Sequence, residues 1–176
     1  SEMCIRDSYI ALAHPKIDMI NSNSLNGLDS LPKPRLFIDK DQQQATIEKF
    51  GLTQERKTIG LCPGAEFGPA KQWPAEHYAT VADTLISKGK QVWLFGSAKD
   101  KPTTDSIKSL VSEENQKHVF ILAGLTSLIE AVDLLGACHT VISNDSGLMH
   151  VAAAVGCEVI GIYGSTSPES VSYTHL

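Results

Sequence analysis

The regular alternation of short apolar runs with helical patterns from residue 57 onward most constrains the fold of this chain. Helical patterns occur at 75–88, 101–112, 127–136 and 146–155. Between them lie apolar runs typical of buried strands, at 58–61, 91–95, 119–122, 140–142 and 159–163. Strands and helices that alternate at these lengths predict an α/β domain built on a doubly wound parallel sheet.

Composition predicts one ordinary globular domain. The 176 residues are 42% hydrophobic and 20% charged, which suffices for a substantial core. A net charge of −5 gives no reason to expect a nucleic-acid partner. No apolar stretch approaches the ~20 residues needed to cross a bilayer, and no signal peptide is apparent, so we expect no transmembrane segment and a cytoplasmic location.

The four cysteines do not indicate a metal site. Cys4, Cys62, Cys138 and Cys157 form no C-x-x-C pair and lack the spacing of zinc ligands. The last three lie in or beside apolar runs, which favours buried, reduced thiols. We therefore predict no metal and no catalytic cysteine.

Local patterns also predict details of two helices. In the helix at 75–88, an apolar face is expected to contain Tyr78, Val81, Ala82 and Leu85, with Gly89 as the C-terminal stop. A short helix is expected at 39–50, with Ile47 and Phe50 on one face.

The segment Ser143 to His150 follows the apolar run 140–142 and opens an alanine-rich helix. Such a strand–turn–helix junction favours an anion, because N–H groups in the first helical turn lack intrahelical partners and the helix dipole adds positive charge. Asp145 and Ser146 are equally suited to cap the helix themselves. The junction alone leaves both interpretations open.

A second loop, residues 62–74, connects another apolar run to a helix. Two glycines and three prolines give it a stiff shape, and Lys71 near its end is placed to contact a phosphate. Because loops that follow parallel strands lie at one edge of the sheet, one pocket can collect this loop, the loops at 96–100 and 124–127, and the junction at 144–150. The absence of a complete G-x-G-x-x-G motif argues against an NAD site.

The strings P-G-A-E-F-G-P-A-K-x-W-P at 63–74 and N-D-S-G-L-M-H at 144–150, with 94–100 and 122–124 between them, resemble a known family. They are similar to glycosyltransferase family 9, the ADP-heptose:lipopolysaccharide heptosyltransferases, especially those of the heptosyltransferase II type. The resemblance runs from about residue 58 to residue 168. It implies the Rossmann-like C-terminal domain of a GT-B glycosyltransferase. Residues 57–170 would then form the nucleotide-sugar-binding domain, 1–56 a partly disordered remnant of the N-terminal domain with its linker, and 171–176 an unmatched tail.

The resemblance implies transfer of heptose from ADP-heptose to the lipopolysaccharide inner core at the membrane surface. Such an enzyme would be cytoplasmic and peripheral to the inner membrane, and would need neither cofactor nor metal. In the family a carboxylate of the N-terminal domain activates the acceptor hydroxyl, and no residue here matches it. The fragment is therefore expected to bind the donor without transferring heptose.

The resemblance also implies roles for particular residues. Lys71 would contact the diphosphate or sugar and stabilise the departing ADP. Ser146 and Gly147 would contact phosphates, Asp145 sugar hydroxyls, and His150 a phosphate or the sugar. The adenosine would lie among Gly96, Ser97, Leu125 and Thr126, although this chain departs near Ala98 and Thr126 from the first heptosyltransferase type. Further candidates for the substrate pocket are Asn144, Glu66 and Phe67, of which Phe67 is equally suited to the core.

Three alternatives remain open on the sequence. The half-length chain is also typical of a nucleotide-binding module without transfer activity. The donor could be another ADP- or UDP-sugar. A nucleotide-dependent oxidoreductase is disfavoured by the missing glycine fingerprint.

Overall fold

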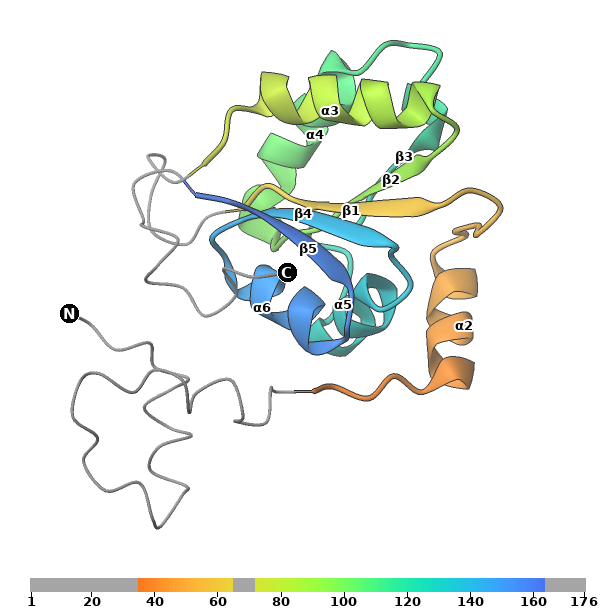
Figure 1. Cartoon of the computed structure of the whole chain (residues 1–176). Helices are drawn as coiled ribbons and strands as arrows, with labels where there is room; N and C mark the ends of the chain where they lie inside the picture. Colours follow the sequence, from red (N-terminus) through yellow and green to blue (C-terminus); the bar gives the residue numbers. More distant parts are fainter. Residues whose placement is uncertain (1–34, 65–71, 164–176) are drawn as a thin grey trace, which may run out of the picture. The chain divides into compact units, whose positions relative to one another are not determined.

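The computed structural model describes residues 35–64 and 72–163 (Figure 1). Its strands are β1 (Thr58–Cys62), β2 (Gln91–Leu94), β3 (Val119–Ile121), β4 (Thr140–Asn144) and β5 (Glu158–Ile162). Its α-helices are α2 (Lys40–Lys49), α3 (Ala75–Ser87), α4 (Lys101–Leu110), α5 (Leu128–Leu135) and α6 (Gly147–Ala154). Two short 3₁₀ turns, η3 (Ala98–Asp100) and η4 (Gln116–His118), lie between them. The predicted alternation of strands and helices is confirmed.

The five strands form one parallel sheet in the order β3-β2-β1-β4-β5. The chain moves outward from β1 through β2 to β3, then returns to place β4 on the other side of β1. Figure 1 shows α3 and α4 on one face of the sheet and α5 and α6 on the other. This is the doubly wound arrangement predicted, and its strand order reverses between β1 and β4.

The strands contribute side chains to a core on each face of the sheet, because successive side chains of a strand point to opposite faces. Ile59 and Leu61 of β1 pack with Tyr78 of α3 and Ile107 of α4 on one face. On the other face Gly60 lies so close to neighbouring side chains that an added Cβ would be 3.2 Å from the Cys138 sulfur. Both faces of β1 are therefore fully covered.

The buried face of α3 is rotated by about one residue from the prediction. The helix buries four side chains: Tyr78, Ala79, Ala82 and Ile86. Leu85 is only half-buried at the edge of the same core, because α3 packs against α4 as well as against the sheet. Gly89 follows the helix with φ +78°, as its predicted role as a stop requires.

The helix predicted at 39–50 is observed as α2, which packs against α5. Asp39 caps it by accepting hydrogen bonds from the N–H groups of Asp41 and Gln42. Its buried face contains Ile47, as predicted, beside the polar Gln43 and Thr46. The domain boundary between residues 56 and 57 stays a prediction. In the described part of the chain no helix is both long and apolar enough to cross a membrane.

Candidate functional site

The reversal of strand order brings two of the predicted motifs together. Cys62 at the end of β1 pairs with Ser143 near the end of β4, so the loop after β1 begins beside the junction before α6. Ligands of doubly wound sheets bind outside the carboxyl ends of the strands at this reversal point. We therefore centre the candidate site here.

The N-terminus of α6 is open toward this edge of the sheet. Ser146 occupies the N-cap position, but its side chain makes no capping hydrogen bond. Its hydroxyl instead lies 3.1 Å from the Ser143 hydroxyl. Gly147 is exposed, and a Cβ added there would meet no heavy atom within 4 Å, so packing does not require a glycine. The first turn can thus be approached closely by a ligand.

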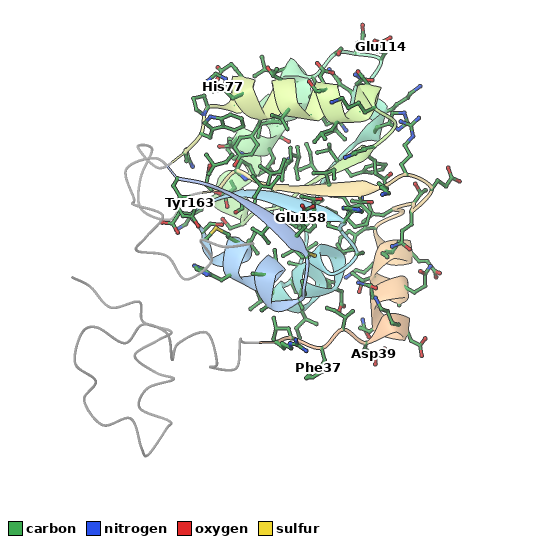
Figure 2. The ribbon with its side chains drawn as sticks, in the orientation of Figure 1. Phe37, Asp39, His77, Glu114, Glu158 and Tyr163 are labelled. Atoms are coloured by element: carbon green, nitrogen blue, oxygen red, sulfur yellow. The ribbon has the colours of Figure 1, made fainter. Side chains whose placement is uncertain are left out.

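Asp145 and His150 flank this helix start, and both are half-buried. His150 lies on α6 one turn beyond Ser146, as predicted from the spacing. Tyr163, directly after β5, is near enough to Asp145 that the carboxylate adds to the effect of burial in raising the pKa of the phenol. In Figure 2, Tyr163 and His77 of α3 lie toward the same end of the sheet.

Asn144, a predicted substrate contact, is fully buried at the end of β4. Its amide nitrogen donates to the Pro63 carbonyl at 2.7 Å. Its amide oxygen accepts from the backbone N–H of Trp73 at 3.3 Å and from the Tyr78 hydroxyl at 3.0 Å. The side chain is therefore directed into the protein. The sequence pattern predicted the strand to end at residue 142, but β4 continues through Asn144, since these contacts hold its last residues in the sheet.

The loops after β2 and β3 also lie together. The N–H of Gly124 donates to the Gly96 carbonyl at 3.0 Å, and a Cβ added to Gly124 would lie 2.9 Å from the Cα of Ala98. Leu125 is 58% exposed, so its apolar side chain is accessible at this rim, and Thr126 is half-buried beside it. The structure thus brings the two predicted adenosine segments into contact with each other.

Asp100 is a residue at this edge that sequence analysis did not single out. Its carboxylate accepts from the backbone N–H of Ser97 at 2.8 Å and from the Ser97 hydroxyl at 2.7 Å. A Cβ added to Gly64 or to Gly96 would approach the Asp100 side chain within 2.8 Å and 2.7 Å respectively. Asp100 therefore fills the space between the ends of β1 and β2. The Ser-x-x-Asp spacing of a capping box could have revealed it.

Glu66, Phe67 and Lys71 lie outside the described residues. The structure gives only the flanks of their segment, Pro63–Gly64 and Gln72–Trp73. On the α3 and α4 side, an open groove of about 430 Å³ is lined by Trp73 and its neighbours Gln72, Pro74 and Ala75, with Pro102, Thr103 and Ser106 opposite. None of the predicted site residues that the structure describes lines this groove.

The two buried thiols that the structure describes, Cys62 and Cys138, are not poised as nucleophiles. Burial raises the pKa of Cys62 to about 12, and the hydrogen bond with Ser143 offsets this only in part. Burial also raises the pKa of Cys138 well above its usual range. Since the thiolate is the reactive form, both residues are inert near neutral pH. They are buried and reduced as predicted, and Cys157 is reduced but only half-buried. Between residues 35 and 163, outside the undescribed 65–71, no three His, Cys, Asp or Glu residues gather as metal ligands would.

Comparison with known proteins decides the family. The family model described as "Glycosyltransferase family 9 (heptosyltransferase)" matches residues 7–174, a wider range than the motifs at 58–168 indicate. The chain belongs to glycosyltransferase family 9. This confirms the resemblance predicted from the two loop motifs.

Individual relatives agree with this assignment. The chain is 49% identical over 167 residues to lipooligosaccharide heptosyltransferase 2 of Haemophilus influenzae. This alignment covers 92% of the chain and 46% of the relative. Its fold is similar to the solved structure of the Escherichia coli ADP-heptose lipopolysaccharide heptosyltransferase II, with a TM-score of 0.82 and 44% identity over 94% of this chain and 50% of that one.

A third likeness is to E. coli heptosyltransferase WaaC with ADP-2-deoxy-2-fluoro heptose, with a TM-score of 0.55 and 25% identity over 82% of this chain and 44% of that one. The chain spans about half the length of the curated relatives it matches. The fold of this half is that of the corresponding part of the GT-B heptosyltransferases.

Proposed function

We propose that this chain forms the donor-binding half of a heptosyltransferase that transfers heptose from ADP-heptose to the lipopolysaccharide inner core. The observation that supports this most directly is the open N-terminus of α6 at the reversal point of the sheet, with Ser146 and Gly147 at its start. Family membership and the names of the relatives supply the substrate class.

The proposed chemistry is stabilisation of the departing ADP. When the bond to the sugar breaks, negative charge accumulates on the diphosphate, and a group fixed in advance stabilises that charge most effectively. The dipole and N–H groups at the start of α6 would supply part of this stabilisation, and the ammonium of Lys71 the rest. Asp145 and His150 would contact the sugar or a phosphate from the same helix start.

The adenosine would lie at the rim formed by the loops after β2 and β3. Leu125 would offer an apolar surface to the base, and backbone groups of Gly96 and Thr126 would hydrogen bond to it. The hydroxyl of Ser97 already donates its proton to Asp100, so in a contact with the ligand its oxygen would act as an acceptor. Glu66 stays a further proposed contact.

Titration calorimetry with ADP, UDP and NAD tests the donor assignment. We expect ADP to bind measurably more tightly than UDP or NAD, because the loops at this edge resemble those of ADP-heptose enzymes and lack the NAD fingerprint. Equal affinities, or a preference for UDP or NAD, would overturn the assignment.

A substitution tests the role of Lys71. Lys71→Ala should weaken ADP binding by about 1.5 to 3 kcal/mol, the range for a hydrogen bond to a charged group. The matched control is Lys88→Ala, which removes an exposed lysine that follows α3. A Lys71→Ala effect no larger than that of Lys88→Ala would place Lys71 away from the phosphates.

The acceptor and the general base would belong to the part of the relatives that this chain does not span. We propose that the complete enzyme acts on the cytoplasmic side, at the inner membrane surface, where its lipopolysaccharide acceptor lies. The 176-residue chain alone should bind ADP but transfer no heptose to a heptosylated acceptor, since positioning of both substrates and the base provide much of the rate. Turnover by the isolated chain would show that a base lies within it, with Asp145, Glu66 and His150 as the candidates.

A further inference from the structure

Asn144 has a set of contacts that the proposed ligand chemistry does not explain. It is the last residue of β4, and its side chain is fully buried. Three hydrogen bonds connect it to Pro63, just after β1, and to Trp73 and Tyr78, just before and within α3. One side chain thus joins the ends of two strands and the start of a helix.

The orientation of this amide is fixed by its partners. The Pro63 carbonyl can only accept, so the amide nitrogen faces it, while the N–H of Trp73 can only donate, so the amide oxygen faces that group. The Tyr78 hydroxyl occupies the second lone pair of the same oxygen. The amide oxygen therefore has no lone pair left for a ligand.

The contacts with Pro63 and Trp73 hold both flanks of the segment between β1 and α3. Asn144 also precedes the turn that leads to Ser146 and Gly147 at the start of α6. Its contacts therefore fix the two flanks relative to that helix start.

Building on the proposed function, we propose that Asn144 is a positioning residue for donor binding. It holds Pro63 and Trp73, the flanks of the segment between β1 and α3, in place relative to the N-terminus of α6, and does not contact the donor itself.

Few side chains could replace asparagine here. Serine is too short to reach both Pro63 and Trp73. An ionised aspartate keeps the shape and the acceptor but has no donor for the Pro63 carbonyl, and its charge would face that oxygen. A protonated aspartate regains one O–H donor and one carbonyl acceptor, so it reproduces the hydrogen bonds of the amide.

This difference gives a pH-dependent test with Asn144→Asp. Burial and the facing Pro63 carbonyl raise the pKa of the introduced carboxyl group, whereas the N–H of Trp73 and the O–H of Tyr78 lower it. The affinity is therefore compared at about pH 8, where the ionised form prevails, and at about pH 5.5, where the protonated form gains population. Relative to the wild type at the same pH, its ADP affinity should be about ten-fold lower at the higher pH, which equals about 1.4 kcal/mol. At the lower pH the loss should shrink to less than about two-fold. Asn144→Ser, which cannot titrate, should show the ten-fold loss at both values.

Tyr78→Phe is the matched control. It removes one of the three hydrogen bonds to the same amide and leaves the contacts with Pro63 and Trp73 intact. We expect its ADP affinity to stay within about two-fold of the wild type. Hydrogen exchange of the Trp73 amide gives a readout without ligand. Exchange should accelerate in Asn144→Ser and, near pH 8, in Asn144→Asp, but not in Tyr78→Phe.

The outcomes separate this inference from the proposed function. Wild-type protein that does not bind ADP would overturn the proposed function and the positioning role with it. If the wild type binds ADP, the positioning role alone is overturned by unchanged affinity in Asn144→Asp at the higher pH, or by an equal loss in Tyr78→Phe. Should Asn144→Asp not fold at the higher pH, Asn144→Ser provides the same comparison.

Discussion

Two glycines with nearly the same backbone conformation allow a steric contact at the candidate site to be measured. Gly124, in the loop between β3 and α5, has φ +73°, and Gly89, after α3, has φ +78°. A Cβ added to Gly124 would lie 2.9 Å from the Cα of Ala98, whereas one added to Gly89 would meet nothing within 4 Å. Alanine at either position suffers the same conformational strain, but only at Gly124 does it also collide with backbone.

The expected magnitudes follow from these two contributions. Placing an L-residue in the left-handed region destabilises the folded state by about 1–2 kcal/mol. Replacing glycine also lowers the entropy of the unfolded chain, which stabilises the folded state by about 0.4–1 kcal/mol. Gly89→Ala should therefore lower the free energy of unfolding by about 0–1.5 kcal/mol. Overpacking adds about 1–3 kcal/mol at Gly124, because the Cα of Ala98 cannot rotate away as a side chain can. Gly124→Ala should thus cost about 1–4.5 kcal/mol in total.

Urea unfolding followed by circular dichroism measures both variants under the same conditions. We expect Gly124→Ala to be the less stable by at least about 1 kcal/mol. ADP affinity should fall in Gly124→Ala and not in Gly89→Ala, because the collision displaces the loop that contains Ser97. Equal losses of stability would refute the contact between the two loops. Unchanged ADP affinity in Gly124→Ala would refute the placement of the adenosine at this rim.

Three further predictions concern buried groups. Cys62 and Cys138 in the native protein should resist alkylation by iodoacetamide at about pH 8, and labelling at the rate of a free thiol would contradict their burial. The pKa of Cys62 rises from 9.0 to about 12 on folding, so the unfolded chain releases this proton at a lower pH than the folded protein does. The free energy of unfolding should therefore fall as the pH rises from about 9 to about 12. A thermal transition temperature that does not fall over this pH range would contradict the prediction. Gln43→Ala should lower the free energy of unfolding by about 1–3 kcal/mol, because it leaves a buried carbonyl of α5 without its donor. The exposed Gln44→Ala is the control and should change it by less than about 0.5 kcal/mol, and an equal effect of both would show that the buried hydrogen bond contributes nothing.

The sequence predicted the strands and helices well because their apolar patterns are strong and separated by glycine and proline signals. Apart from the one-residue rotation of the buried face of α3, its main errors lie at polar residues that are nevertheless buried. Ser143 and Asn144 read as loop residues by composition, yet both are fully buried in β4. Gln43 and Thr46 were not among the residues predicted for the buried face of α2, yet both hydrogen bond to Asp133 of α5. Those partners lie 87 to 90 residues away, so no local pattern reveals them.

The candidate site was predicted to the level of which loops share an edge. Parallel strands with helical crossovers place all their following loops at one edge, and that much follows from the alternation alone. The strand order does not follow from it. Periodicity is the same for any order of five buried strands, so the neighbouring positions of β1 and β4, which bring the two motifs together, required either the resemblance or the structure.

The junction from Ser143 to His150 had two competing interpretations, a helix cap and an anion site, and the geometry of one hydroxyl bears on both. A capping serine would direct its oxygen at the N–H groups of the first turn, where a phosphate oxygen would otherwise bind. The Ser146 side chain makes no such bond, and its oxygen lies beside that of Ser143 instead. Ser143 in turn donates to the carbonyl of Asn144, the residue whose amide holds the opposite loop. The two hydroxyls are thus tied to the backbone carbonyl of Asn144 and not to the N–H groups of the first turn, which leaves those N–H groups without competition from a Ser146 cap.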